Sequence, residues 1–265
     1  MSTIRITTIQ APNQEFIIQE LSAYIARRLG ITTEFLVEAP WQERERLLDA
    51  GQVEIAWICG LPYVWKAELG TPELELLVAP VMQGERYQDR PIYYSDVIMR
   101  RESRYERFED LRGGRWAYNE PHSHSGYNVT RHHLAGIGAE RDFFATTIES
   151  GSHERSIEMV IDGIVDASAI DSTVLELARD TDDRIRTDLR VLTSLGPSPI
   201  PPLVILKRVE DGLREDIRKA LVEMHLQEEG RRILDKGKIK RLQAVRDEDY
   251  DPIRKMALEA KNVRW

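Results

Sequence analysis

The stretch with the most concentrated chemistry is Asn119-Glu-Pro-His-Ser-His-Ser-Gly-Tyr-Asn128, which combines hydroxyl groups, a glycine and two histidines. It lies between a strand-like run at 115–118 and a segment with helical character at about 127–134. The N–H groups of a helix's first turn lack intrahelical partners, and together with the helix dipole they favour an anion. Ser123 and Ser125 would add hydroxyl donors, and Gly126 would let the backbone approach a ligand closely. The pattern indicates an oxyanion site; the alternative is a serine that only caps the helix.

Two further polar turns each follow a strand-like run. Residues 149–153, which end in His153, separate a strand-like run at 143–148 from a helix at 154–161. Asp171-Ser-Thr173 follows the apolar run at 165–170 and caps the next helix. A purely local role at a helix start is one interpretation of His153 and of Asp171.

A metal site is the second chemistry that the histidines raise. His122, His124, His132 and His133 are close together in a chain that has only 6 histidines. A zinc site needs three or four converging ligands, and neighbouring residues on a helix point about 100° apart. No carboxylate or cysteine has diagnostic spacing, so we expect neither a bound metal nor a cofactor.

The elements that must position these residues form an α/β pattern. Strand-like runs at 4–9, 33–37, 53–58 and 74–81 alternate with helical patterns at 15–29, 41–50 and from 60 onward. Ligands of open parallel sheets bind beyond the carboxyl ends of the strands. Residues 10–13 and 60–63, including Tyr63, are therefore expected on a ligand-binding rim.

A second α/β unit follows, with strand-like runs at 93–100, 115–118, 143–148, 165–170 and 189–195. Residues 196–202 form a proline-rich linker, because proline excludes helix and stiffens the chain. After a strand at 203–207 the pattern is helical to the end. We expect these terminal helices to return to the first unit.

Composition excludes several classes of protein. The net charge of −8 and the lack of a basic stripe argue against nucleic-acid binding. No apolar run approaches the ~20 residues that span a bilayer, so no membrane insertion is expected. The only cysteine is Cys59, so no disulfide framework is expected. The first residues enter a strand pattern without a signal-peptide pattern, which favours a soluble, non-exported chain or one trimmed of its leader.

An ordered set of motifs covers nearly the whole chain. It comprises Gly51-Gln-Val-Glu-Ile-Ala-Trp57, Gly60-Leu-Pro-Tyr63, Tyr93-Tyr-Ser-Asp-Val-Ile-Met99, Asp110-Leu-Arg-Gly-Gly114, Pro121-His-Ser-His-Ser-Gly126, Gly151-Ser-His153, Val165-Asp-Ala-Ser-Ala-Ile-Asp171 and Asp249-Tyr250. In this set the chain resembles the phosphonate/phosphate-type solute-binding proteins of ABC transporters. The resemblance implies the type II periplasmic-binding-protein fold, an α/β architecture whose two lobes each hold a mixed, mostly parallel sheet flanked by helices.

The resemblance also implies a division of the chain. Lobe 1 would comprise 1–96 and 203–265, and lobe 2 would comprise 97–202. The chain would cross between them near 93–100 and 196–207, and hinge closure would grip the ligand in a cleft between the lobes.

The family's site residues carry over motif by motif. Its Ser-Thr-Ser-Gly turn, which holds phosphonate oxygens, corresponds to Ser123, His124, Ser125 and Gly126, with His124 in place of the threonine. Its cleft histidine corresponds to His153, and its cleft tyrosines to Tyr63 and to Tyr93 or Tyr94. Asp171 falls where the family meets the distal part of the ligand, such as an amine.

The function that the resemblance implies is capture of a small phosphonate, phosphate or phosphate ester for ABC-type uptake or sensing. The expected partners are this small anionic ligand and an ABC transporter permease, and the expected state is a periplasmic or extracytoplasmic monomer. The alternative is a cytoplasmic enzyme of the same fold acting on a phosphorylated or pyrimidine-like molecule. We expect no enzyme, because Ser125 and His153 lack a GxSxG elbow and Cys59 is the single cysteine.

Overall fold

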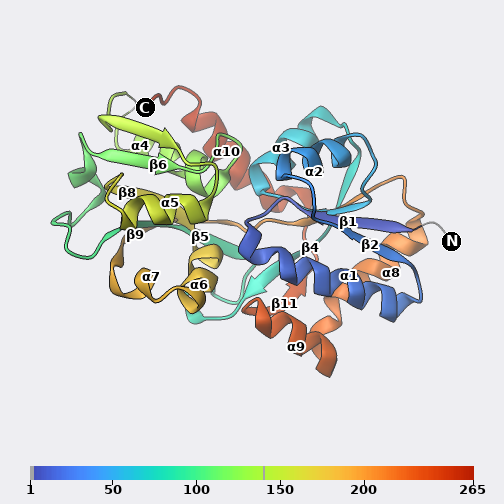
Figure 1. Ribbon diagram of the computed structural model, residues 1–265. Coiled ribbons are helices and arrows are strands. Elements are labelled where there is room, and N and C mark those ends of the chain that lie inside the picture. The colour runs from blue at the N-terminus through green and yellow to red at the C-terminus, as the bar shows by residue number, and fades with distance from the viewer. Residues whose placement is uncertain (1–2, 140) are drawn as a thin grey trace. The chain divides into compact units, whose positions relative to one another are not determined.

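The chain folds into two compact units, each built around its own mixed sheet flanked by helices (Figure 1). The computed structural model describes residues 3–139 and 141–265. Unit 1 comprises the chain up to Ile92 together with Pro199–Asp251, and unit 2 comprises Tyr93–Ser198 together with Pro252–Trp265. Within these described residues, every helix is too short or too polar to cross a membrane.

The sheet of unit 1 has the strand order β11-β4-β10-β3-β1-β2. Its strands are β1 (Ile4–Thr8), β2 (Thr33–Leu36), β3 (Ile55–Trp57), β4 (Leu74–Met82), β10 (Leu203–Leu206) and β11 (Ile239–Gln243). Strand β1 pairs in parallel with β2 and β3, whereas β10 pairs antiparallel with β3 and β4. The central strand β3 is wholly buried, as expected for a strand covered on both faces.

The helices of unit 1 pack apolar stripes against this sheet. They are α1 (Glu15–Leu29), α2 (Trp41–Asp49), α3 (Gly60–Leu69), α8 (Asp211–Val222) and α9 (Glu228–Lys236), with 3-10 turns at Pro12–Gln14, Glu85–Tyr87, Met224–Leu226 and Asp247–Tyr250. In α1 the buried positions Ile17, Ile18, Leu21 and Ile25 follow helical spacing, so the predicted helix at 15–29 is confirmed.

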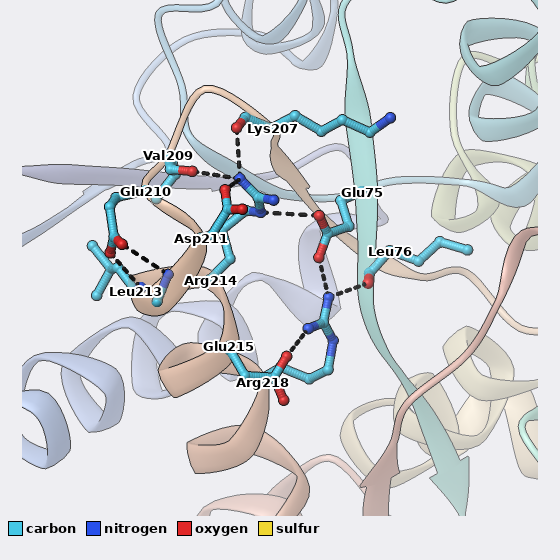
Figure 2. A network of polar contacts seen from close by, with 11 residues as sticks. Glu75, Leu76, Lys207, Val209, Glu210, Asp211, Leu213, Arg214, Glu215 and Arg218 are labelled. Atoms are coloured by element: carbon cyan, nitrogen blue, oxygen red, sulfur yellow. Dashed lines mark hydrogen bonds and ion pairs between the residues drawn. The ribbon is translucent and has the colours of Figure 1, made fainter.

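An ion-pair network fixes the start of α8 to the sheet of unit 1 (Figure 2). Arg214 pairs with Glu75 of β4 at 2.9 Å, and Arg218 pairs with the other carboxylate oxygen of Glu75. Glu210 caps the helix by accepting hydrogen bonds from the N–H groups of Gly212 and Leu213 at 3.0 and 2.8 Å. Glu75, Arg214 and Arg218 are half-buried and align α8 along β4, whereas the cap at Glu210 is exposed.

The sheet of unit 2 has the strand order β7-β6-β8-β5-β9. Its strands are β5 (Ile92–Arg100), β6 (Arg115–Tyr118), β7 (Thr146–Glu149), β8 (Ala167–Asp171) and β9 (Leu189–Pro199). Strand β6 runs parallel to β7 and β8, and β5 runs antiparallel to β8. The flanking helices are α4 (Val129–Gly136), α5 (His153–Ile161), α6 (Ser172–Thr181), α7 (Asp183–Thr187) and α10 (Asp251–Ala260), with short helical turns at Phe108–Leu111 and His124–Asn128.

The C-terminal segment belongs to unit 2, whereas the sequence analysis assigned it to the first lobe. Val263 lies in the aromatic core of unit 2, and Trp265 contacts the rings of Tyr118 and Tyr127 at 5.6 and 5.0 Å between centroids. Arg131 of α4 also donates to the carbonyl oxygen of Val263 at 2.9 Å. Helical periodicity shows that a helix has an apolar face to bury. It does not show which of the two sheets that face packs against, so the assignment to the first lobe was wrong.

Three expected elements also differ. The proline-rich stretch at 196–202 is half strand, because β9 continues to Pro199. The C-terminal region is not wholly helical, because β11 pairs with β4 at the edge of the sheet. The strand predicted at 143–148 begins only at Thr146, since Phe143 and Phe144 turn into the core instead.

Candidate functional site

Polar turns that are far apart in the sequence lie together at one end of the strands of the unit 2 sheet. Strands β6, β7 and β8 are parallel, so Asn119, the turn before His153, and Asp171 all follow carboxyl ends at the same edge. Strand β5 is antiparallel and pairs Ser95 with Asp171, which brings its first residues, Tyr93 and Tyr94, to that edge. This is where ligands of open α/β sheets bind.

The helix that follows the Ser/His/Gly turn begins with a π-helical turn over His124–Asn128, before α4. The Asn128 N–H donates to the carbonyl oxygen of Ser123 at 3.1 Å, and the Ser123 Oγ accepts from the Gly126 N–H at 3.0 Å. Ser123 is thus the N-cap, as the capping alternative stated. Short π-helical turns are frequent at functional sites.

Ser125 and His153 form a buried pair across two turns. The Ser125 Oγ lies 3.1 Å from His153 Nε2, and the two residues are 3% and 5% exposed. Burial lowers the pKa of His153 to about 4, so the ring is neutral at pH 7. When Nε2–H donates to the Ser125 Oγ, the serine hydrogen is free to donate to an anion.

Gly126 allows a close approach within this cluster. A Cβ added to Gly126 would lie 2.0 Å from Asn119 Oδ1 and 3.3 Å from His153 Cε1. With Asn119 in this position, a side chain at residue 126 would have to displace it. Asn119 was part of the polar stretch in the sequence, but its role beside Gly126 depends on tertiary contact and could not be predicted.

His124 points into the interior of unit 2 and is fully buried. Its Nε2 lies 3.0 Å from Ser198 Oγ, and its Nδ1 lies 3.2 Å from Asn128 Nδ2. Burial lowers the pKa of His124 to about 3, and nearby His132 lowers it further. The positive charge that a histidine could add to the turn is therefore absent at pH 7.

Asp171 is the N-cap of α6 and is almost fully buried. Its Oδ1 accepts from the N–H and the Oγ1 of Thr173, at 2.8 and 2.7 Å. Burial raises the pKa of Asp171 to about 6, Asp96 adds to this, and the bonds from Thr173 oppose it. The predicted cap is confirmed, and contact with a ligand stays a prediction.

The predicted tyrosines are divided between the units. Tyr93 is buried and its ring lies 6.5 Å from that of His124, while Tyr94 donates its N–H to Ser172 Oγ at 3.1 Å. Tyr63 belongs to unit 1, where its hydroxyl donates to Asp247 Oδ1 at 2.7 Å and its ring packs edge-on against Tyr250 at 5.0 Å. Ligand contact by each tyrosine stays a prediction.

The histidine cluster is dispersed by the fold. His132 Nε2 lies 2.8 Å from Glu259 Oε2, and His133 packs against the ring of Phe108 at 4.4 Å. Over residues 3–139 and 141–265, three or more histidine, cysteine, aspartate or glutamate side chains do not converge as metal ligands would.

Comparison with known proteins identifies one matching family and several similar structures. A family model described as "ABC transporter, phosphonate, periplasmic substrate-binding protein" matches residues 6–250. The binding protein component of an ABC phosphonate transporter from Pseudomonas aeruginosa has a TM-score of 0.85 and 19% identity, over 98% of this chain and 86% of that one. PhnD1 from Prochlorococcus marinus in complex with methylphosphonate has a TM-score of 0.85 and 17% identity, over 98% and 99%.

A protein from Xanthomonas citri bound to ATP is also similar, with a TM-score of 0.76 and 15% identity over 100% of this chain and 98% of that chain. At these identities the similarity shows the fold. The two mixed sheets flanked by helices match the type II periplasmic-binding-protein fold, which confirms the predicted fold class.

Proposed function

Because the chain belongs to the family of phosphonate-type periplasmic substrate-binding proteins of ABC transporters, we propose that it captures a small phosphonate, phosphate or phosphate ester. The family and the similar structures are substrate-binding proteins and not enzymes, so the enzymatic alternative is set aside. A methylphosphonate complex of a protein with this fold supports the ligand class.

The observation that carries the proposal is the Ser125–His153 pair beside the turn at Ser123–Gly126. A neutral His153 that donates through Nε2 orients the Ser125 hydroxyl towards an oxyanion. Gly126 leaves room for the side chains of Asn119 and His153 to pack against the turn. Hydroxyl and backbone donors at a helix start need no cationic side chain to hold an anion.

The remaining predicted residues take supporting roles in this proposal. Tyr93, Tyr94 and Asp171 lie at the same end of the sheet as the turn, where Asp171 would meet a cationic distal group of the ligand. Tyr63 stays a proposed ligand contact from unit 1. His124 supports the turn from the interior, because both of its ring nitrogens are engaged by residues of unit 2.

We further propose that the protein works as a monomer outside the cytoplasmic membrane and delivers its ligand to an ABC permease. The family description supports the periplasmic location and the transporter. Sensing of the same ligand without transport is the alternative outcome.

A thermal-shift panel tests the ligand class. Methylphosphonate, an aminoalkyl phosphonate, inorganic phosphate, a phosphate ester and ATP are each compared with chloride at equal ionic strength. A ligand at 100 times its Kd stabilises the native state by about 2.7 kcal/mol, which is a clear shift in melting temperature. No shift by any phosphorus oxyanion at millimolar concentration contradicts the proposed function.

A further inference from the structure

The side chain of Asn119 is buried against the turn at Ser123–Gly126, and in the described part of the chain its amide oxygen makes no hydrogen bond. Asn119 follows β6 and is 8% exposed, and its Oδ1 lies 2.0 Å from where a Cβ of Gly126 would be. Among the residues that the structure describes, this buried oxygen has no hydrogen-bond donor. A buried acceptor without a donor is unfavourable, and native proteins keep few of them.

The backbone around Asn119 needs no help from this side chain. The carbonyl oxygen of Asn119 accepts from the Gly151 N–H at 2.8 Å, and Tyr118 accepts from the Ser150 N–H at 2.8 Å. These bonds join the Asn119 turn to the turn before His153. The cap of the π-helical turn is supplied by Ser123. The amide of Asn119 is therefore surplus to the local structure.

A second acceptor lies next to it. His153 Nδ1 is buried and has no partner within the described chain, and the adjacent Cε1 faces the same position on Gly126. When Nε2–H donates to Ser125, Nδ1 carries a lone pair. The cluster thus presents donors from Ser125 and the turn together with two acceptors. An anion whose oxygens only accept leaves both acceptors unsatisfied, whereas an anion that retains one O–H supplies the missing donor.

We propose that Asn119 is a further ligand-binding residue, and that the site takes its oxyanion singly protonated with the P–O–H donating to Asn119 Oδ1. This inference rests on the proposed function and narrows its substrate class. Phosphate monoesters lose their second proton at a pH of roughly 6, so the singly protonated form is a minor species at pH 7 that the site would select. A sulfonate of the same shape has no such proton. The site therefore selects phosphonates over sulfonates.

The titratable side chains on the surrounding elements of unit 2 include those of Tyr93, Tyr94, Asp96, Tyr118, Glu120, His122, His124, Tyr127, Glu149, His153, Glu154 and Asp171. Asp171 has a pKa of about 6, close to the second ionisation of a phosphate monoester. The variant Asp171→Asn cannot take up a proton at this position, so any protons still taken up on binding do not go to residue 171. It keeps an acceptor at the helix cap.

The test is calorimetric titration with the matched pair methylphosphonate and methanesulfonate. It is run above the second ionisation of the phosphonate, in two buffers that differ in ionisation enthalpy. The wild-type protein is expected to take up protons on binding methylphosphonate, to take up none on binding methanesulfonate, and to prefer the phosphonate by at least about 10-fold. Asp171→Asn should leave the proton count unchanged.

Two variants of Asn119 locate the acceptor. Asn119→Leu keeps the shape without polar atoms and should reduce the preference to near unity, whereas Asn119→Asp keeps an acceptor and should retain the preference. Melting temperatures show whether each variant folds. If Asn119→Leu does not fold, the anion preference of Asn119→Asp and the number of protons that wild type takes up test the proposal.

Several results would overturn the inference. Equal wild-type affinities for the two anions, or a preference unchanged in Asn119→Leu, would leave Asn119 a packing residue. Proton uptake with methanesulfonate would place the proton on the protein instead. Binding of neither anion would contradict the proposed function itself, which is a different result from equal binding.

Discussion

The Nε2 of His124 lies 3.0 Å from the Oγ of Ser198, and both side chains are buried in unit 2. With the amide of Asn128 donating to Nδ1, the ring carries its proton on Nε2 and donates it to Ser198. Ser198 is the last residue of unit 2 before the chain enters unit 1 at Pro199. His124 therefore ties the turn at Ser123–Gly126 to the end of β9.

Removing either partner of this bond should destabilise the protein. His124→Ala leaves a cavity and an unpaired Ser198, so we expect a loss of about 2–4 kcal/mol in the free energy of unfolding. Ser198→Ala should lose about 1 kcal/mol. In urea denaturation the double variant should lose less than the sum of the two, because the partners share one interaction. Strict additivity would show that the two side chains do not interact.

His124→Thr restores the residue that the family has in this turn. The sequence analysis would place residue 124 beside the anion, where such a change shifts ligand preference. Since both ring nitrogens are engaged inside unit 2, we expect the affinities for all phosphonates and phosphates to fall together. If calorimetric titration shows that the order of affinities changes, His124 contacts the ligand and this prediction is wrong.

The two buried histidines should make the protein acid-sensitive. The pKa values of His124 and His153 are lowered to about 3 and about 4, so between about pH 4 and 6.5 the unfolded chain binds more protons. The free energy of unfolding should therefore fall as pH decreases through 6.5. For His124 alone the loss at pH 4.5 is roughly 2–3 kcal/mol. Denaturation at pH 7.5 and 4.5 should show a smaller loss in His124→Gln; an equal loss would contradict the neutral buried ring.

The contribution of Asp171 to stability depends on pH in the opposite direction. Its pKa is raised to about 6, so the folded state binds more protons between the ordinary value of 3.8 and 6, and this stabilisation is lost as pH rises through 6. Asp171→Asn keeps the cap acceptor without ionising. Its stability relative to wild type should therefore improve by about 2–3 kcal/mol from pH 4 to pH 8. Asp171→Ala lacks the same titration and should be about 1 kcal/mol less stable than Asp171→Asn at every pH, because it has no cap acceptor. Parallel pH profiles for wild type and Asp171→Asn would contradict the raised pKa.

The contact between Gly126 and Asn119 makes a steric prediction. Gly126→Ala places a Cβ 2.0 Å from Asn119 Oδ1, which forces local displacement and should lower the free energy of unfolding by about 1–3 kcal/mol. Adding Asn119→Ala removes the clashing oxygen and should recover most of this loss. Thermal denaturation of the two single variants and the double variant checks this. A double variant as unstable as the sum would place the strain elsewhere.

Periodicity and turn chemistry predicted most elements of both sheets, because buried strands and amphipathic helices leave their pattern in a local window. The helix at 15–29 and the Asp171 cap are examples. The extension of β9 to Pro199 and the edge strand β11 were missed, since pairing with a distant strand decided them.

The candidate site divides in the same way. The serines, glycine and histidine of the turns could be found from their types and from the family resemblance. The inward direction of His124 could not, because its partner Ser198 is 74 positions away in the chain. Asn119 carries no local signal either: its significance comes from the missing Cβ of Gly126 and from an oxygen without a donor.

The most direct measurement is calorimetric titration of methylphosphonate into wild type, Ser125→Ala and Ser103→Ala. Ser103 lies in the turn after β5, away from the polar sheet edge, and is the matched control. We predict that Ser125→Ala weakens binding roughly 10- to 150-fold through loss of a hydrogen bond to a charged group, while Ser103→Ala binds as wild type. Equal melting temperatures of the three unliganded proteins would show that the fold is intact. Wild-type affinity in a well-folded Ser125→Ala would contradict an anion site at this turn.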